Sequence, residues 1–114
     1  MKHVDYRQID ELRALGEGDQ LALLILEQFR ETIPQRIAAI DSSIAQADFA
    51  GIRRGVHALK SSSSYLGAVE LGALCDQMES LSPGESLDSL RALRAELAEE
   101  CRLTVAELES ALRA

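Results

Sequence analysis

Apolar residues recur three or four positions apart along most of the chain, the spacing that gathers side chains on one face of an α-helix. The first segment with this spacing is short, contains Ile9, Leu12 and Leu15, and ends at a glycine-rich turn. A much longer segment follows Asp19, the residue expected to cap it. Its apolar positions are Leu21, Leu24, Ile25, Phe29, Ile33, Ile37, Ile40 and Ile44. Because Pro34 lies inside this segment, we expect a kinked helix or two helices that abut there.

Three further segments keep the helical spacing. Asp48 is expected to cap the third helix, and Gly67 to end it or to turn the chain into the fourth. The inner positions of the third helix are Ile52, Val56, Leu59, Ser63 and Leu66. Those of the fourth are Leu71, Leu74, Cys75, Met78 and Leu81. A loop at Ser82-Pro83-Gly84 precedes the last helix. Its inner positions are Leu90, Leu93, Leu97, Cys101, Thr104, Leu108 and Ala111.

Length and composition agree with this helical pattern. A chain of 114 residues can build one hydrophobic core and is too short for two. Aromatic residues make up only 4 %, and Leu and Ala, which favour helices, supply most of the apolar side chains. Short loops between long amphipathic helices make neighbouring helices antiparallel. We therefore expect an all-α fold, an antiparallel four-helix bundle with a short extra N-terminal helix, formed as a single domain by residues 1–114.

Charge and cysteine content narrow the class of protein. The chain has 12 Lys and Arg against 19 Asp and Glu, a formal net charge of −7, which would repel the phosphate backbone of nucleic acid. The sequence has no run of eighteen apolar residues, and its first ten lack the apolar core of a signal peptide. Cys75 and Cys101 both fall on apolar helix faces, so we expect reduced core thiols in a cytoplasmic protein, with a disulfide as the open alternative.

The third helix carries the candidate chemistry. His57 lies about 100° around the helix from Val56 and so faces away from the core. Arg53, Arg54, Lys60, Ser61 and Ser64 share its face. A neutral imidazole has a nitrogen lone pair for nucleophilic attack, and a phosphoryl group added there brings about two negative charges. Lys60 can stabilise those charges, with Arg53 or Arg54 on the other side. We see no acidic cluster for Mg²⁺ on this face, so the metal would come from elsewhere.

The run from His57 to Ala68 resembles the signature of histidine-containing phosphotransfer (HPt) domains. That signature is roughly His, any residue, Leu, Lys, Gly, Ser, a small residue, two variable positions, an aliphatic residue and Gly. The matching positions are His57, Leu59, Lys60, Ser62, Ser63, Leu66 and Gly67. The flanking residues agree as well, and they are Phe29, Pro34, Ala47, Asp48, Leu71 and Cys75. The resemblance extends over nearly the whole chain.

The resemblance implies a phosphocarrier in a multistep His–Asp phosphorelay, not an enzyme with its own turnover. His57 would be phosphorylated on Nε2 by the aspartyl phosphate of a receiver domain and would return the group to another. Lys60 would be the electrostatic partner, and Glu79 would orient the imidazole through Nδ1. The chain would need no cofactor of its own, because the receiver supplies Mg²⁺. Expected partners are the receiver domains of response regulators or a hybrid sensor histidine kinase, with no membrane insertion and a monomeric isolated domain.

Ser61 departs from the family pattern, which usually has Gly one turn beyond the histidine. Two consequences stay open. The hydroxymethyl group either crowds the phosphoryl group or alters partner choice, or it instead donates a hydrogen bond to the phosphoryl group.

Other interpretations were weighed against this one. His3 is expected to be a solvated residue near a frayed terminus, and two distant histidines with two core cysteines give no metal-ligand spacing. A docking or scaffold bundle that works without phosphorylation is the alternative function, although it has no need of His57 or Lys60. A kinase or phosphatase is disfavoured, because we find neither a glycine-rich nucleotide loop nor an acidic metal cluster.

The docking surface can be sketched from the same pattern. A receiver is expected to cover His57 and to contact the third helix, the long second helix and the edge of the first. Candidate contact residues are Leu12, Leu15, Leu23 and Gln28. The sequence leaves open the cognate partners, the direction of phosphoryl flow, and whether the protein stands alone or is the cytoplasmic C-terminal part of a membrane-bound sensor kinase.

Overall fold

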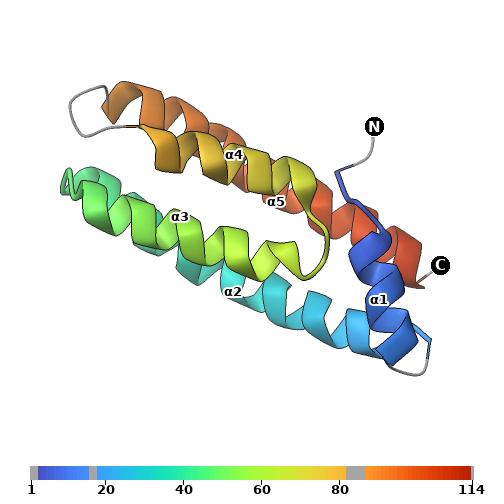
Figure 1. Ribbon diagram of the computed structural model, residues 1–114. Coiled ribbons are helices and arrows are strands. Elements are labelled where there is room, and N and C mark those ends of the chain that lie inside the picture. The colour runs from blue at the N-terminus through green and yellow to red at the C-terminus, as the bar shows by residue number, and fades with distance from the viewer. Residues whose placement is uncertain (1–2, 16–17, 82–86, 114) are drawn as a thin grey trace.

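The computed structural model describes residues 3–15, 18–81 and 87–113, and these residues form five helices. The helices are α1 (Arg7–Leu15), α2 (Gln20–Ala45), α3 (Phe49–Ser64), α4 (Val69–Ser80) and α5 (Leu87–Arg113). Helices α2 to α5 form an antiparallel bundle in which each packs against the next and α5 closes the ring against α2 (Figure 1). Helix α1 lies across the end of the bundle and packs against α2. This is the expected fold. The Ser82-Pro83-Gly84 loop, and Gly16 and Glu17 of the Gly16-Glu17-Gly18 turn after the first helix, lie outside the described residues.

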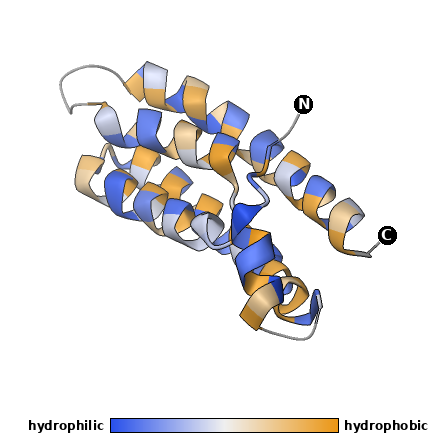
Figure 2. Cartoon of the chain, turned by 45° about the vertical axis from the view of Figure 1, so that its right-hand side comes forward, coloured by the Kyte–Doolittle hydropathy of each residue, from blue (hydrophilic) through white to orange (hydrophobic). Residues whose placement is uncertain are grey.

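The bundle is held together by an apolar core to which all five helices contribute. Figure 2 shows apolar and polar residues alternating in bands along the helices, the pattern of amphipathic helices that share a core. The largest side chains with almost no exposure are Ile9, Leu26, Ile40, Ile52, Val56, Leu59, Leu66, Leu71, Met78, Leu90, Leu97 and Leu108. Cys75 and Cys101 are free thiols in this core, and burial raises the pKa of each to about 12. The expectation of reduced core cysteines agrees with this arrangement.

Helix α2 differs in several details from its sequence pattern. It runs without a break through Pro34, which excludes two abutting helices. Its buried residues are Ala22, Leu26, Phe29, Ile40 and Ile44, whereas Leu24 is 57 % exposed. The expected inner face is therefore wrong near the start of the helix, where α2 packs against α1 as well as its bundle neighbours. Asp19 precedes the helix without a side-chain cap, because its carboxylate accepts a hydrogen bond from Arg13 instead.

Helix α3 agrees with its pattern at four of the five expected inner positions, and the fifth, Leu66, lies just beyond its end. Its N-cap is Asp48, whose carboxylate accepts a hydrogen bond of 2.9 Å from the backbone N–H of Gly51. The five expected inner residues, from Ile52 to Leu66, are all buried. The helix also passes very close to α2, because a Cβ at Gly55 would lie 2.9 Å from Cγ1 of Ile40. These contacts fix the rotation of α3 about its axis.

The inner faces of α4 and α5 are largely as expected. Leu71, Leu74, Cys75 and Met78 are buried on α4, while Leu81 is only half-buried. On α5 the expected positions are buried except for Leu93, which is half-buried, and Ala111, which is exposed. Leu112 takes the inner position at that end of the helix. The last expected position of α5 was therefore wrong by one residue.

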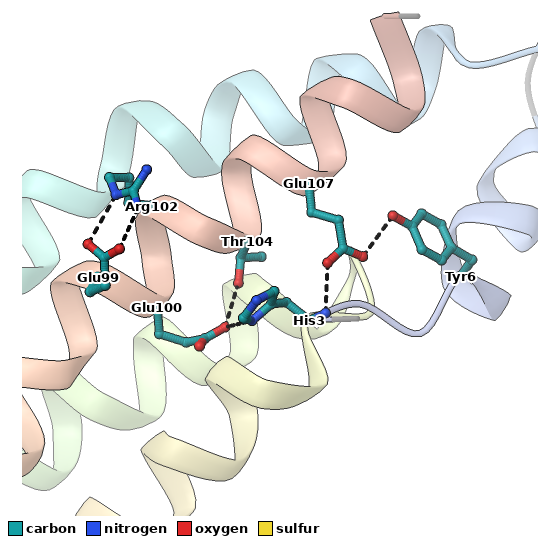
Figure 3. A network of polar contacts seen from close by, with 7 residues as sticks. All are labelled: His3, Tyr6, Glu99, Glu100, Arg102, Thr104 and Glu107. Carbon is teal, nitrogen blue, oxygen red and sulfur yellow. Dashed lines mark hydrogen bonds and ion pairs between the residues drawn. The ribbon is translucent and has the colours of Figure 1, made fainter. Parts of the chain in front are cut away.

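The N-terminal segment is tied to α5 by a polar network (Figure 3). The Glu107 carboxylate accepts hydrogen bonds from the backbone N–H of His3 at 2.7 Å and from the Tyr6 hydroxyl at 2.9 Å. Glu100 lies 2.7 Å from Nδ1 of His3 and also accepts a hydrogen bond from Thr104. Burial, together with the hydrogen bond to Glu107, raises the pKa of Tyr6 to about 12. The expectation of a solvated His3 is wrong, because this side chain is only 14 % exposed.

The turn between α3 and α4 depends on Gly67. Its φ of +71° lies in the left-handed region that disfavours residues with a Cβ. The carbonyl of Gly67 accepts hydrogen bonds from the backbone N–H groups of Asp5 and Val69, at 2.7 and 2.8 Å. A Cβ at this position would lie only 2.0 Å from the carbonyl oxygen of Asp5. This glycine therefore allows both the turn and the close approach of the N-terminal segment.

We predict that Gly67→Ala lowers the free energy of unfolding by about 2 kcal/mol or more, through backbone strain and the contact with Asp5. Gly72→Ala is the matched control, because Gly72 lies inside α4 with no atom within 4 Å of the added Cβ. Alanine is favoured over glycine in a helix by about 1 kcal/mol, so this control should keep or raise stability. Urea unfolding followed by circular dichroism measures the stability of both variants. A Gly67→Ala midpoint equal to that of the wild type would contradict the proposed role of Gly67.

Candidate functional site

His57 projects from the outer surface of α3. Its side chain is 69 % exposed, while Val56 and Leu59 beside it are fully buried. Since the buried neighbours fix the rotation of the helix, the imidazole is presented to solvent without any special backbone geometry. The sequence predicted this outward position, and the structure agrees with it.

Glu79 reaches His57 from the neighbouring helix. Glu79 is on α4, and its Oε1 lies 3.2 Å from Nδ1 of His57. A carboxylate can only accept a hydrogen bond, so this contact requires the proton of a neutral imidazole to be on Nδ1. The other ring nitrogen, Nε2, then keeps its lone pair. An imidazole nitrogen with a free lone pair can act as a nucleophile.

Lys60 lies one turn beyond His57 on α3 and also contacts α4. Its ammonium group donates a hydrogen bond to Oδ1 of Asp76. This hydrogen bond is the main reason that the pKa of Lys60 is raised above its ordinary value. Asp76 was not expected at the site. Its spacing from Glu79 equals that of Lys60 from His57, and this was the only signal in the sequence that could have suggested it.

The other basic residues of this face take different places. Arg53 and Arg54 are both exposed. The guanidinium of Arg54 lies 3.9 Å from Asp48 at the start of α3, so its ion-pair partner is the N-cap of its own helix. The structure therefore places Lys60 in the contacts between α3 and α4 near His57, whereas Arg54 pairs within its own helix.

The serine run is part of the helix, as expected. The hydroxyl groups of Ser62, Ser63 and Ser64 donate hydrogen bonds of 2.8–3.0 Å to carbonyl groups three or four residues earlier. Such bonds satisfy serine side chains inside a helix. Ser61 is exposed, and its carbonyl is the acceptor for Ser64. The role of the Ser61 hydroxyl beside His57 stays a prediction.

The expected docking residues differ in exposure. Leu15 is 79 % exposed and Gln28 is also exposed, whereas Leu12 and Leu23 are half-buried against the core. Among the described residues, three other large apolar side chains are exposed, and one of them is Val69 at the start of α4. The other two are Leu24 on α2 and Tyr65 directly after α3. Sequence reasoning missed Leu24 because it was assigned to the inner face of α2.

We predict that Glu79→Ala shifts the neutral tautomer of His57 from Nδ1–H toward Nε2–H. Losing a hydrogen bond to a charged group changes such a ratio by about tenfold or less at an exposed site. Long-range ¹H–¹⁵N correlation spectra of the imidazole measure the ratio. Glu70→Ala, which removes the same charge from the start of α4, serves as the control. An unchanged tautomer ratio in Glu79→Ala would show that the contact does not orient the ring.

Comparisons with known proteins identify the family and the fold of the chain. The family model described as the Hpt domain matches residues 24–113. The crystal structure of histidine-containing phosphotransfer protein B (HptB) from Pseudomonas aeruginosa PAO1 superimposes with a TM-score of 0.84. That match covers 97 % of this chain and 95 % of the other at 22 % sequence identity, a likeness that shows a shared fold. A search of curated proteins finds no match. Because the family model matches most of the length of this chain, the chain belongs to the Hpt domain family.

Proposed function

We propose that the chain carries a phosphoryl group on Nε2 of His57 and exchanges it with phosphorylated aspartates of receiver domains. Hpt domains are phosphocarriers of phosphorelays, and the chain is a member of that family. The single observation that carries the assignment to His57 is its geometry. The imidazole is exposed, and its Nδ1 lies against Glu79, which leaves Nε2 as the nucleophile.

The transfer step follows from the two contacts across α3 and α4. The lone pair of Nε2 attacks the phosphorus atom, the P–N bond forms, and the P–O bond breaks with its electrons going to the departing aspartate. Because Nδ1 keeps its proton, the ring becomes positively charged, and the carboxylate of Glu79 balances that charge. The ammonium of Lys60 is one helical turn away and can balance the oxygens of the phosphoryl group. The reverse reaction returns the group to a receiver.

The remaining chemistry would come from the partner. We assign no nucleotide site or catalytic metal to the chain, and we expect the Mg²⁺ needed for transfer to be held by the receiver. In the described ranges, no three His, Cys, Asp or Glu side chains are grouped as metal ligands. None of the described helices is long and apolar enough to cross a membrane. We further propose that residues 1–114 act as one monomeric domain, with receivers docking over the exposed side of α3.

The decisive experiment measures phosphoryl transfer from a receiver domain charged with a small phosphodonor and Mg²⁺. We expect label on the wild type that is labile to acid and stable to base, and at least a hundredfold less on His57→Gln, because the acceptor nitrogen is gone. His3→Gln is the matched control, since the chain has two histidines and His3 contacts α5 instead. It should accept label as the wild type does.

Two outcomes would contradict the proposal. Equal labelling of His57→Gln would place the acceptor elsewhere. No label on the folded wild type with any of several receivers would favour the docking or scaffold function instead. Ser61→Gly would then be the first reversion to examine, because glycine is the usual residue of the family at that position.

A further inference from the structure

Lys60 already has an anionic partner in the unphosphorylated protein. Its ammonium group donates to Oδ1 of Asp76, and the two side chains are 39 % and 58 % exposed. Asp76 precedes Glu79 by one turn of α4, just as His57 precedes Lys60 by one turn of α3. The antiparallel course of the two helices thus forms two adjacent pairs, His57 with Glu79 and Lys60 with Asp76. The lysine next to the acceptor is engaged before any phosphoryl group arrives.

A phosphoryl group on His57 would compete with Asp76 for Lys60. The group brings about two negative charges to a face that already has two carboxylates. The lysine side chain has four rotatable bonds and a compact charged end, so it can turn from one anion to another without any change in the helices. Asp76 has no such alternative, because its short side chain is fixed to α4. When Lys60 turns to the phosphoryl group, its contact with Asp76 is weakened or broken.

From these contacts, and resting on the proposed function, we infer that Asp76 is the resting counterion of Lys60 and a positioning residue for phosphoryl transfer. In the free protein it holds the ammonium group beside His57. In the phosphorylated protein it competes for the same ammonium and so raises the free energy of the phosphohistidine. The Lys60–Asp76 pair would thus favour donation of the phosphoryl group over its retention.

The test compares the equilibrium of phosphoryl exchange, obtained from forward and reverse rates with one receiver, in the wild type and Asp76→Asn. Asparagine keeps the shape of the side chain and removes its charge. Because the pair is exposed, we expect a shift of about two- to fivefold toward the phosphorylated domain, with a smaller shift at high salt. Glu109→Gln is the matched control, since it removes the same charge on α5, where Glu109 pairs with Arg30 of α2.

Repeating the Asp76→Asn comparison in a Lys60→Gln variant shows whether Asp76 acts through Lys60 or only repels the phosphoryl group by its own charge. If Asp76 acts through Lys60, Asp76→Asn should have little effect once Lys60 is replaced. An equal shift in both backgrounds, or no shift in the wild-type background, would overturn the inference. A wild type that accepts no label from any receiver would overturn the proposed function and this inference with it. Normal labelling without a shift would overturn the inference alone.

Discussion

The packing of α3 against α4 is the constraint on which the site depends. Two contacts, His57 with Glu79 and Lys60 with Asp76, join these helices. They exist only if each helix has the right rotation and the right shift along its axis. The buried faces set the rotation, and the turn at Gly67 sets where α4 begins relative to the end of α3. A shift by one residue would turn side chains by about 100° and remove both contacts.

The N-terminal segment reinforces this arrangement from outside the bundle. Asp5 donates its backbone N–H to Gly67, and the segment is held to α5 through Glu100 and Glu107. The turn that positions α4 is therefore in contact with a segment far away in the sequence. The same contact explains why the turn cannot accept a side chain, since the space a Cβ would occupy is filled by the backbone of Asp5.

Electrostatics at the site are balanced rather than simply positive. A cationic residue beside His57 stabilises a phosphoryl group bonded to it, but a phosphocarrier must also release that group. The carboxylates of Asp76 and Glu79 lie next to Lys60 and His57, and each satisfies a nitrogen of α3. Glu79 supports the imidazole, whereas Asp76 competes for the lysine. Under the proposed function, the opposing demands of acceptance and release provide a physical reason for acidic residues beside the histidine that would carry the phosphoryl group.

Much of the fold and the outward position of His57 could be predicted from the sequence, because both depend on local periodicity. The inner face of α3 has a regular helical spacing, and it fixes the outward position of His57 without knowledge of other helices. Contacts between distant segments could not be predicted in the same way, because local periodicity does not determine which helices meet or in what register. The pairing of Asp76 with Lys60 requires the register of two helices, and the burial of His3 depends on Glu100, 97 residues away. The inner face of α2 was misassigned near Leu24, where α1 adds a second packing partner.

The most direct test of the central claim is to identify the ring nitrogen that carries the phosphoryl group. In ¹⁵N-labelled protein phosphorylated by a receiver, ³¹P–¹⁵N coupling in NMR spectra assigns the bonded atom. With Glu79 on Nδ1, the phosphorus should be bonded to Nε2 of His57. Phosphorus on Nδ1, or on any other residue, would contradict the geometry described for α3 and α4.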